Sequence, residues 1–220
     1  MKIAIIGTGN VGKAIGGSLV RAGHEVTFAA RDAAKTRQVA SEMGASAAAS
    51  AADAASDADV ILLAVPFQAF DWVAAELGGH AAGKVVIDAS NPAKADFSGL
   101  ATEGGTSGAE RYAAILPGAR IAKAFNTVFV AFQADPTALG TTLDLLYATD
   151  DAAARTAVAA IARSIGFRPV NVGPLAAARE LEAMAWLNIR LQMLTGGAWD
   201  TAYALVAPPA ASLTAAVVAA

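Results

Sequence analysis

The chain contains no cysteine and only two histidines, His24 and His80. The absence of cysteine excludes disulfide bonds, thiolate nucleophiles and cysteine-based metal sites. The two histidines lie far apart in the sequence and neither has the spacing of a metal ligand, so no metal site is predicted. Lysine and arginine form no cluster that could follow a phosphate backbone, and the net charge is −3, so no nucleic acid partner is expected.

Charged residues are also few, at 16% of 220 residues, whereas hydrophobic residues make up 55%. A chain with this composition can bury enough apolar surface to fold, which excludes disorder as its main state. Its length suits one domain with a short appendage. More than a quarter of the residues are alanine, which favours helices but weakens periodicity as a guide, because alanine is accommodated on either face.

No targeting or membrane segment is recognised in the sequence. The apolar stretch at the N-terminus ends at Gly7 and is too short for the core of a signal peptide. Residues 201–220 carry no charge, but they contain Pro208 and Pro209 and are rich in alanine. We therefore interpret them as a packed or frayed tail rather than a membrane anchor, and we expect a cytoplasmic protein with no membrane partner.

Short runs rich in valine and isoleucine alternate with alanine-rich stretches of helical length. Strands are predicted at 2–6, 25–30, 45–47, 60–65, 84–88, 120–124, 143–148 and 168–172. Helices are predicted at 11–22, 33–43, a short stretch after Ser50, 67–77, 107–116, 151–165 and 175–194. This alternation predicts an α/β fold with a doubly wound, mostly parallel sheet.

Local signals mark several helix ends. Asp32 and Ser50 are predicted N-caps, Ser107 and Glu110 form a capping box, and Gly44 ends the second helix. The apolar runs lack period-two alternation, which is typical of strands covered on both faces. Region 93–108 is polar for this chain and is predicted to be a loop near a site.

The segment Gly7-Thr8-Gly9-Asn10-Val11-Gly12 has the pattern G-x-G-x-x-G, directly after a predicted strand and at the start of a helix. Gly7 would make the tight turn, Gly9 would let a diphosphate approach the backbone, and Gly12 would let the helix pack close to the strand. The helix N-terminus would supply free N–H groups to the phosphates. This context predicts a dinucleotide site in a Rossmann-type domain.

The end of the second strand indicates which dinucleotide is bound. Enzymes that use NAD place an acidic residue there to bind the ribose 2′-hydroxyl, but this chain has Ala29 and Ala30, followed by Arg31 and, one helical turn later, Lys35. Two cations and no carboxylate favour a 2′-phosphate, hence NADP(H). In the alternative interpretation, Asp32 binds the ribose and selects NAD.

Three further strand ends carry turn-forming residues or amides. They are Pro66 after the fourth strand, Asn91 after the fifth and Asn126 after the sixth. Ligands lie outside the carboxyl ends of parallel strands, so either amide could bind a ribose hydroxyl or the nicotinamide carboxamide. Each amide could equally be a simple turn residue.

The usual catalytic groups are missing from the sequence. There is no Tyr-x-x-x-Lys pair and no G-x-S-x-G nucleophile motif. Reduction of a carbonyl would need a proton donor, so direct hydride transfer to an aromatic carrier is favoured, because the protein then only has to hold two rings together. We therefore predict no catalytic side chain.

Several segments together resemble the NADP oxidoreductases that depend on coenzyme F420, a deazaflavin. The same domain type forms the cytosolic part of the six-transmembrane metalloreductases. The matching segments are MKIAIIGTGNVGKAI, AARDAAK, VILLAVPFQA, VVIDASNP, KAFNT and GPLAAARELEAMAWLNIRL.

The resemblance implies a Rossmann-type α/β fold with a small C-terminal helical addition, and a homodimer. Residues 1–172 would be the NADP-binding domain, and residues 173–220 a helix and tail packed on the same domain or on a dimer partner. Thr8, Arg31 and Lys35 would hold the 2′-phosphate. The turn at Ala64-Val65-Pro66 would border the nicotinamide.

The resemblance also implies the second substrate, a small redox acceptor. Coenzyme F420 would lie over the nicotinamide, near Asn126 and the C-terminal helix. A flavin, quinone or ferric chelate is the alternative acceptor, and a non-catalytic NADPH sensor is the alternative of a different class.

Overall fold

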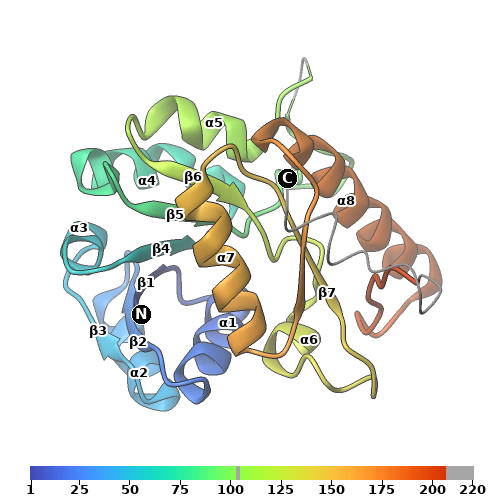
Figure 1. The fold of residues 1–220 in the computed structure, drawn as a ribbon, viewed down its shortest axis with the longest axis horizontal. Helices are drawn as coiled ribbons and strands as arrows, with labels where there is room; N and C mark the ends of the chain where they lie inside the picture. Colours follow the sequence, from blue (N-terminus) through green and yellow to red (C-terminus); the bar gives the residue numbers. More distant parts are fainter. Residues whose placement is uncertain (103–104, 207–220) are drawn as a thin grey trace.

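The computed structural model describes residues 1–102 and 105–206 and contains a six-stranded sheet in which every pairing is parallel (Figure 1). The strands, in their order across the sheet, are β3 (Ser46–Ala47), β2 (Glu25–Ala29), β1 (Lys2–Ile6), β4 (Val60–Leu63), β5 (Val85–Asp88) and β6 (Arg120–Lys123). The order reverses between β1 and β4, which makes their carboxyl ends the switch point at which such sheets bind ligands. The predicted fold class is confirmed.

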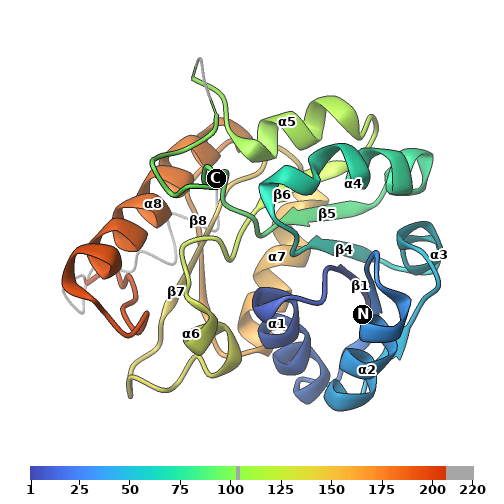
Figure 2. The ribbon, with the colours of Figure 1, turned by 180° about the vertical axis from the view of Figure 1, so that it is seen from behind.

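Helices cover both faces of this sheet (Figures 1 and 2). One face packs against α1 (Asn10–Arg21), α2 (Ala33–Met43) and α7 (Ala152–Ser164), with α6 (Val130–Ala134) beside α1. The other face packs against α3 (Ala51–Ser56), α4 (Phe70–Leu77) and α5 (Gly108–Ile115). The last helix, α8 (Ala178–Thr195), flanks the sheet and contacts α5.

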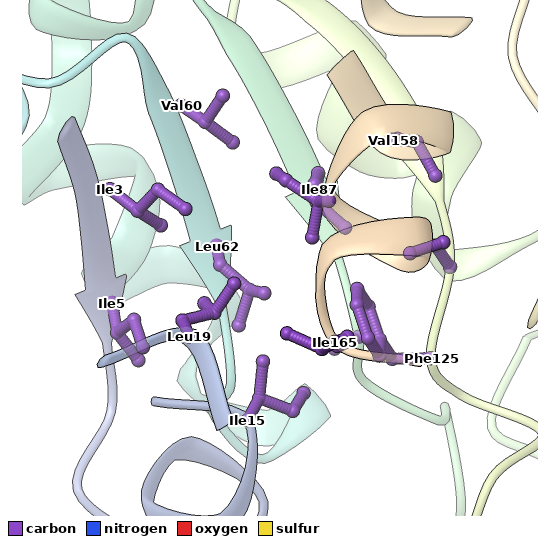
Figure 3. Close-up of a cluster of buried hydrophobic side chains, with 14 of the residues drawn as sticks. Ile3, Ile5, Ile15, Leu19, Val60, Leu62, Ile87, Phe125, Val158 and Ile165 are labelled. Carbon is purple, nitrogen blue, oxygen red and sulfur yellow. The ribbon is translucent and has the colours of Figure 1, made fainter. Parts of the chain in front are cut away.

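Alternate residues of the strands supply the two cores. Ile3 and Ile5 of β1 point into the layer of α1 and α7, together with Leu62 of β4, whereas Ala4 and Ile6 point into the opposite layer. Figure 3 shows the first core, where side chains from β1, β4 and β5 meet side chains from α1 and α7. Because both faces are buried, the strands are apolar at most positions, as their sequences indicate.

The predicted helix ends are confirmed. Asp32 accepts a hydrogen bond from the Lys35 backbone N–H at 3.0 Å, and Ser50 caps α3 in the same way. Ser107 and Glu110 form both bonds of the capping box at the start of α5. Gly44 ends α2 in the left-handed conformation. These local bonds need no tertiary contact, which is why the sequence revealed them.

The C-terminal part of the sheet differs from the prediction. β7 (Asp144–Tyr147) and β8 (Arg168–Asn171) form a separate parallel pair, joined to β6 by one antiparallel bridge between Lys123 and Ala148. Thr149 donates a 2.7 Å side-chain hydrogen bond to the carbonyl of Ile121 and so closes the turn beside β6. Strand propensity predicted β7 and β8, but the strand with which each one pairs depends on the path of the chain in three dimensions, which propensity does not reveal.

Two helical segments were also predicted incompletely. α6 was missed because it has five residues and no side-chain cap. The segment predicted as one helix at 67–77 begins as a 3-10 turn, η1 (Phe67–Ala69), and is followed by a second one, η2 (Gly78–Ala81), which contains His80. A third, η3 (Leu175–Ala177), precedes α8.

The structure tests only part of what was predicted for the C-terminal region. Within residues 1–102 and 105–206, no helix is long and apolar enough to cross a membrane. The predicted tail at 201–220 lies largely outside the described residues, as do two residues of the predicted loop at 93–108. The outer face of α8 exposes Leu187, Leu191 and Leu194, but the homodimer stays a prediction.

We predict that Gly16→Ala destabilises the fold whereas Gly17→Ala does not. A Cβ on Gly16 would lie 2.3 Å from Cζ of Phe28 and 2.9 Å from Cδ1 of Ile5, both buried. Overpacking of this kind costs roughly 1–3 kcal/mol. A Cβ on Gly17 would meet only the flexible ends of Arg21 and Met43, at 3.3 Å.

Denaturant unfolding of the two variants measures the difference. Both replacements gain helix propensity of up to about 1 kcal/mol, so the comparison isolates the clash. Equal free energies of unfolding would contradict the packing argument.

Candidate functional site

The glycine turn at the end of β1 lies at the switch point and is closed against β4. Gly7 has φ 125°, and a Cβ there would lie 2.2 Å from the carbonyl oxygen of Ala64. A Cβ on Gly12 would lie 2.2 Å from the carbonyl oxygen of Gly7. Both positions therefore exclude any side chain, and they bring the start of α1 against the ends of β1 and β4.

Gly9 differs from these two glycines because its surroundings are open. It is exposed, and a Cβ there would meet no atom within 4 Å. It is the N-cap of α1 and offers no side chain to the N–H groups of the first turn, which begins with the exposed Asn10 and half-buried Val11. Open space in front of uncapped N–H groups fits a diphosphate, so the turn suits the predicted dinucleotide.

The end of β2 presents the two cations that the sequence analysis singled out. Arg31 and Lys35 are both exposed, and within the described part of the chain neither takes part in an ion pair. The Asp32 carboxylate is occupied by the backbone of α2. Asp32 is thus a helix cap, as predicted. Thr8 of the glycine turn is buried.

The turn after β4 lies directly beside the glycine turn. Ala64 crowds Gly7, and Cγ1 of Val65 is 3.3 Å from the position of a Gly7 Cβ. Pro66 follows and is exposed, and Phe67 turns back into the core. The residues predicted to border the nicotinamide are therefore adjacent to those predicted to hold the diphosphate.

The turns after β5 and β6 are joined by their two asparagines. Asn91 Nδ2 donates to the backbone carbonyl of Asn126 at 2.9 Å, and Asn126 Nδ2 donates to Asn91 Oδ1 at 3.1 Å. Asn126 Nδ2 also donates to the carbonyl of Leu181 on α8 at 3.0 Å. The buried Oδ1 atom of Asn126 has no hydrogen-bond partner among residues 1–102 and 105–206. An orphaned acceptor after the carboxyl end of a parallel strand fits a ligand that brings an N–H donor.

A strained residue sets the direction of this turn. Phe125 has φ 67°, which is uncommon for a bulky residue and costs of order 1–3 kcal/mol. Its ring is fully buried and packs edge-on against Phe167, with centroids 6.4 Å apart. Its carbonyl accepts hydrogen bonds from Val128 and Gln133. The surrounding structure therefore holds the chain in a sharp turn at Phe125, which directs Asn126 back towards Asn91.

A buried ion network lies behind these turns, and sequence reasoning missed it. Lys123 Nζ lies 2.8 Å from Asp88 Oδ2 and 2.9 Å from Glu182 Oε1, and all three side chains are at most 1% exposed. Lys123 also donates to the carbonyl of Ser90 at 2.6 Å. The network therefore connects β5, β6 and α8.

The charges in this network are unequal, with two carboxylates around one ammonium group. Burial by itself would lower the pKa of Lys123, but Asp88 and Glu182 outweigh it and the pKa is raised. Burial raises the pKa of Glu182 above its usual value, against the opposing effect of Lys123, and Asp88 adds to the rise. Lys123 is therefore held in its charged form, whereas burial and the nearby Asp88 disfavour the charged form of Glu182.

Part of this network left a signal in the sequence. Asp88 ends the run VVID and Lys123 ends the run RIAK, both in strands predicted to be covered on two faces. A charge in such a strand must be paired, so the two residues could have been predicted as a pair. Glu182 carried no comparable signal, because glutamate is common on exposed helix faces.

Other features of the molecule do not form this site. A cleft of about 730 Å³ lies at the far end of α1 and is lined by residues such as Arg21 and Arg163, none of them a predicted site residue. The described residues contain no group of three His, Asp or Glu that could hold a metal ion.

Comparisons with known proteins agree with this geometry. Residues 2–92 match the family model described as "NADP oxidoreductase coenzyme F420-dependent". The F420-dependent NADP reductase of Methanothermobacter thermautotrophicus is 35% identical over 211 residues, which cover 88% of this chain and 90% of that protein.

Two further relatives extend the comparison. Metalloreductase STEAP3 of Rattus norvegicus is 30% identical over 184 residues, covering 83% of this chain, and the match spans only 36% of the length of STEAP3. The crystal structure of a candidate F420-dependent NADP reductase from Arthrobacter sp. FB24 superimposes with a TM-score of 0.84 at 30% identity, covering 94% of this chain and 100% of that one.

The glycine turn, the cations after β2 and the matches over nearly the whole chain lead to one assignment. The chain belongs to the family of coenzyme F420-dependent NADP oxidoreductases and is an NADP-dependent oxidoreductase.

Proposed function

We propose that this protein transfers hydride between NADP(H) and coenzyme F420. One observation carries the proposal: an open glycine turn with two exposed cations after β2 occurs in a chain whose match to an F420-dependent NADP reductase covers 88% of this chain and 90% of that protein. The match supports F420 as the acceptor because it extends well beyond the nucleotide-binding segment at residues 2–92.

The adenosine half of NADP(H) would be held by charge and backbone. The first-turn N–H groups of α1, opened by Gly9, bind the diphosphate. Arg31 and Lys35 bind the 2′-phosphate by charge-assisted hydrogen bonds, and the Thr8 hydroxyl adds a neutral one. Since Asp32 caps α2, no carboxylate competes for the ribose 2′ position.

The nicotinamide half would be held by shape and amides. Ala64, Val65 and Pro66 provide a wall beside the glycine turn, and the free Oδ1 of Asn126 accepts an N–H of the carboxamide. Asn91 holds Asn126 in this orientation by accepting a hydrogen bond from its side-chain amide and donating one to its backbone carbonyl. The bound cofactor supplies the hydride, and the protein orients the ring and keeps water away.

No side chain is assigned a proton-transfer role. Hydride exchange between two aromatic carriers needs no general acid or base at the protein. The titratable groups nearest the strand ends, Lys123, Asp88 and Glu182, are buried and bonded to one another. F420 would stack on the nicotinamide beside Asn126 and α8.

A second candidate function is supported by the match to STEAP3, a metalloreductase. In that case NADPH would reduce a flavin or quinone by hydride transfer, or two equivalents of a ferric chelate by one electron each with release of a proton. The nucleotide site would be unchanged and only the acceptor would differ.

We expect the purified protein to oxidise NADPH with F420 faster than with FMN, a quinone or a ferric chelate. Anaerobic assays that follow NADPH absorbance with each acceptor in turn make the comparison. Turnover with a ferric chelate or FMN but not with F420 would identify the second candidate. Tight NADPH binding without turnover on any acceptor would indicate a non-catalytic sensor.

Arg31→Ala is expected to weaken NADPH binding on the order of 10–100-fold and to leave NADH binding nearly unchanged. Loss of charge-assisted hydrogen bonds to one phosphate costs roughly 1.5–3 kcal/mol. Arg37→Ala is the charge-matched control, because Arg37 is an exposed arginine on α2, the helix that follows Arg31. Calorimetric titration of the wild type and both variants with NADPH and with NADH measures the affinities. Equal weakening of NADPH binding and NADH binding in Arg31→Ala would show that Arg31 does not bind the 2′-phosphate.

Gly9→Val is expected to abolish NADPH binding in a protein that stays folded. The valine side chain has open space around it and would occupy the path of the diphosphate. Gly12→Ala provides the contrast, because its Cβ would clash with the Gly7 carbonyl and lower stability together with binding. Circular dichroism and titration of both variants test this, and retained binding in Gly9→Val refutes the proposed diphosphate path.

A further inference from the structure

We infer that Glu182 is a positioning residue that holds the nicotinamide half of the site in place from the C-terminal helix. The inference rests on the proposed function, because it takes Asn126 as a cofactor ligand. The turns after β4, β5 and β6 each connect to Glu182 by a short path of contacts.

The first path runs through Lys123 to the turn after β5. Glu182 Oε1 lies 2.9 Å from Lys123 Nζ, and Lys123 donates to the carbonyl of Ser90 at 2.6 Å. The Asp88 carboxylate accepts hydrogen bonds from both the backbone N–H and the hydroxyl of Ser90, at 2.9 and 2.6 Å. Ser90 precedes Asn91, so the network fixes the backbone that carries one of the two asparagines.

The second path runs through Gly108 to the turn after β4. The Gly108 N–H, at the start of α5, lies 2.9 and 3.1 Å from the two carboxylate oxygens of Glu182. A Cβ on Gly108 would lie 3.2 Å from Glu182 Oε1 and 3.3 Å from Cε2 of Phe67. Gly108 therefore packs closely against Glu182 of α8 and against Phe67, the residue after Pro66. A larger residue at position 108 would displace these neighbours.

The third path is the shortest and reaches Asn126 directly. Leu181 precedes Glu182, and its carbonyl accepts the second hydrogen bond of Asn126 Nδ2. With Nδ2 bound by Leu181 and Asn91, the amide has one orientation, and its Oδ1 is left free. A shift of α8 would move the Leu181 carbonyl away from Asn126 Nδ2. The Asn126 side chain could then rotate, and its Oδ1 would no longer be directed at the ligand.

The charge balance makes this role testable without loss of the fold. Lys123 keeps Asp88 and the Ser90 carbonyl when the charge at Glu182 is removed, so no buried ammonium is left unpaired. A glutamine at this position can still accept from Gly108. Glu182→Gln therefore loosens the attachment of α8 and preserves the apolar packing of Leu181 and Ala185.

The experiment compares two ligands on Glu182→Gln and on Glu180→Gln, an exposed glutamate of the same helix. NADPH occupies both halves of the site, whereas adenosine 2′,5′-bisphosphate occupies only the adenosine half. For Glu182→Gln we expect NADPH to bind about tenfold more weakly, the equivalent of one hydrogen bond, with the bisphosphate unchanged. Glu180→Gln should bind both ligands as the wild type does.

The alternative outcomes are distinct. If Glu182→Gln binds both ligands normally, or weakens both equally, Glu182 has only a structural role and the inference is wrong. If the wild type binds neither ligand, the proposed function itself fails. Should Glu182→Gln not fold, Gly108→Ala displaces the same carboxylate without removing its charge, and the same selective loss of NADPH affinity is required of it.

Discussion

The arrangement of the ligand-binding edge depends on one buried ammonium group, that of Lys123, between two buried carboxylates. An isolated charge in this environment would be costly, and Lys123 is paired with Asp88 on the neighbouring strand and with Glu182 on α8. The two carboxylates come from parts of the chain nearly a hundred residues apart. The pairing with Glu182 attaches the C-terminal helix to the ends of β5 and β6.

The two halves of the proposed cofactor site use different physical means. At the adenosine end, the two cations and Gly9 are exposed, and they select a phosphate by charge and by open backbone N–H groups. At the nicotinamide end, Asn126 is buried and Asn91 is half-buried, and they select by hydrogen-bond direction. A flexible charged ligand tolerates loose placement, whereas a ring that must face another ring does not.

Rigidity at the nicotinamide end has a visible source in the backbone. Phe125 is held in the left-handed region by its buried ring and by two hydrogen bonds to its carbonyl. A bulky residue keeps such a conformation only where packing over-determines it. Phe125 directly precedes Asn126, where the proposed hydride chemistry requires positioning and no proton transfer.

The sequence by itself determined the features that arise from local interactions. The glycine turn and the caps at Asp32, Ser50 and Ser107 follow from backbone sterics and from hydrogen bonds within a few residues. The strands of the main sheet follow from their short runs of valine, isoleucine and leucine. The cations at Arg31 and Lys35 could be proposed from sequence because they lie at a fixed distance from a strand end. Only the tertiary structure decided the pairing of β7 with β8, the contact between Asn91 and Asn126, and the burial of Glu182. These contacts join residues far apart in the chain, and their energies depend on a dry environment that exists only once the layers have packed.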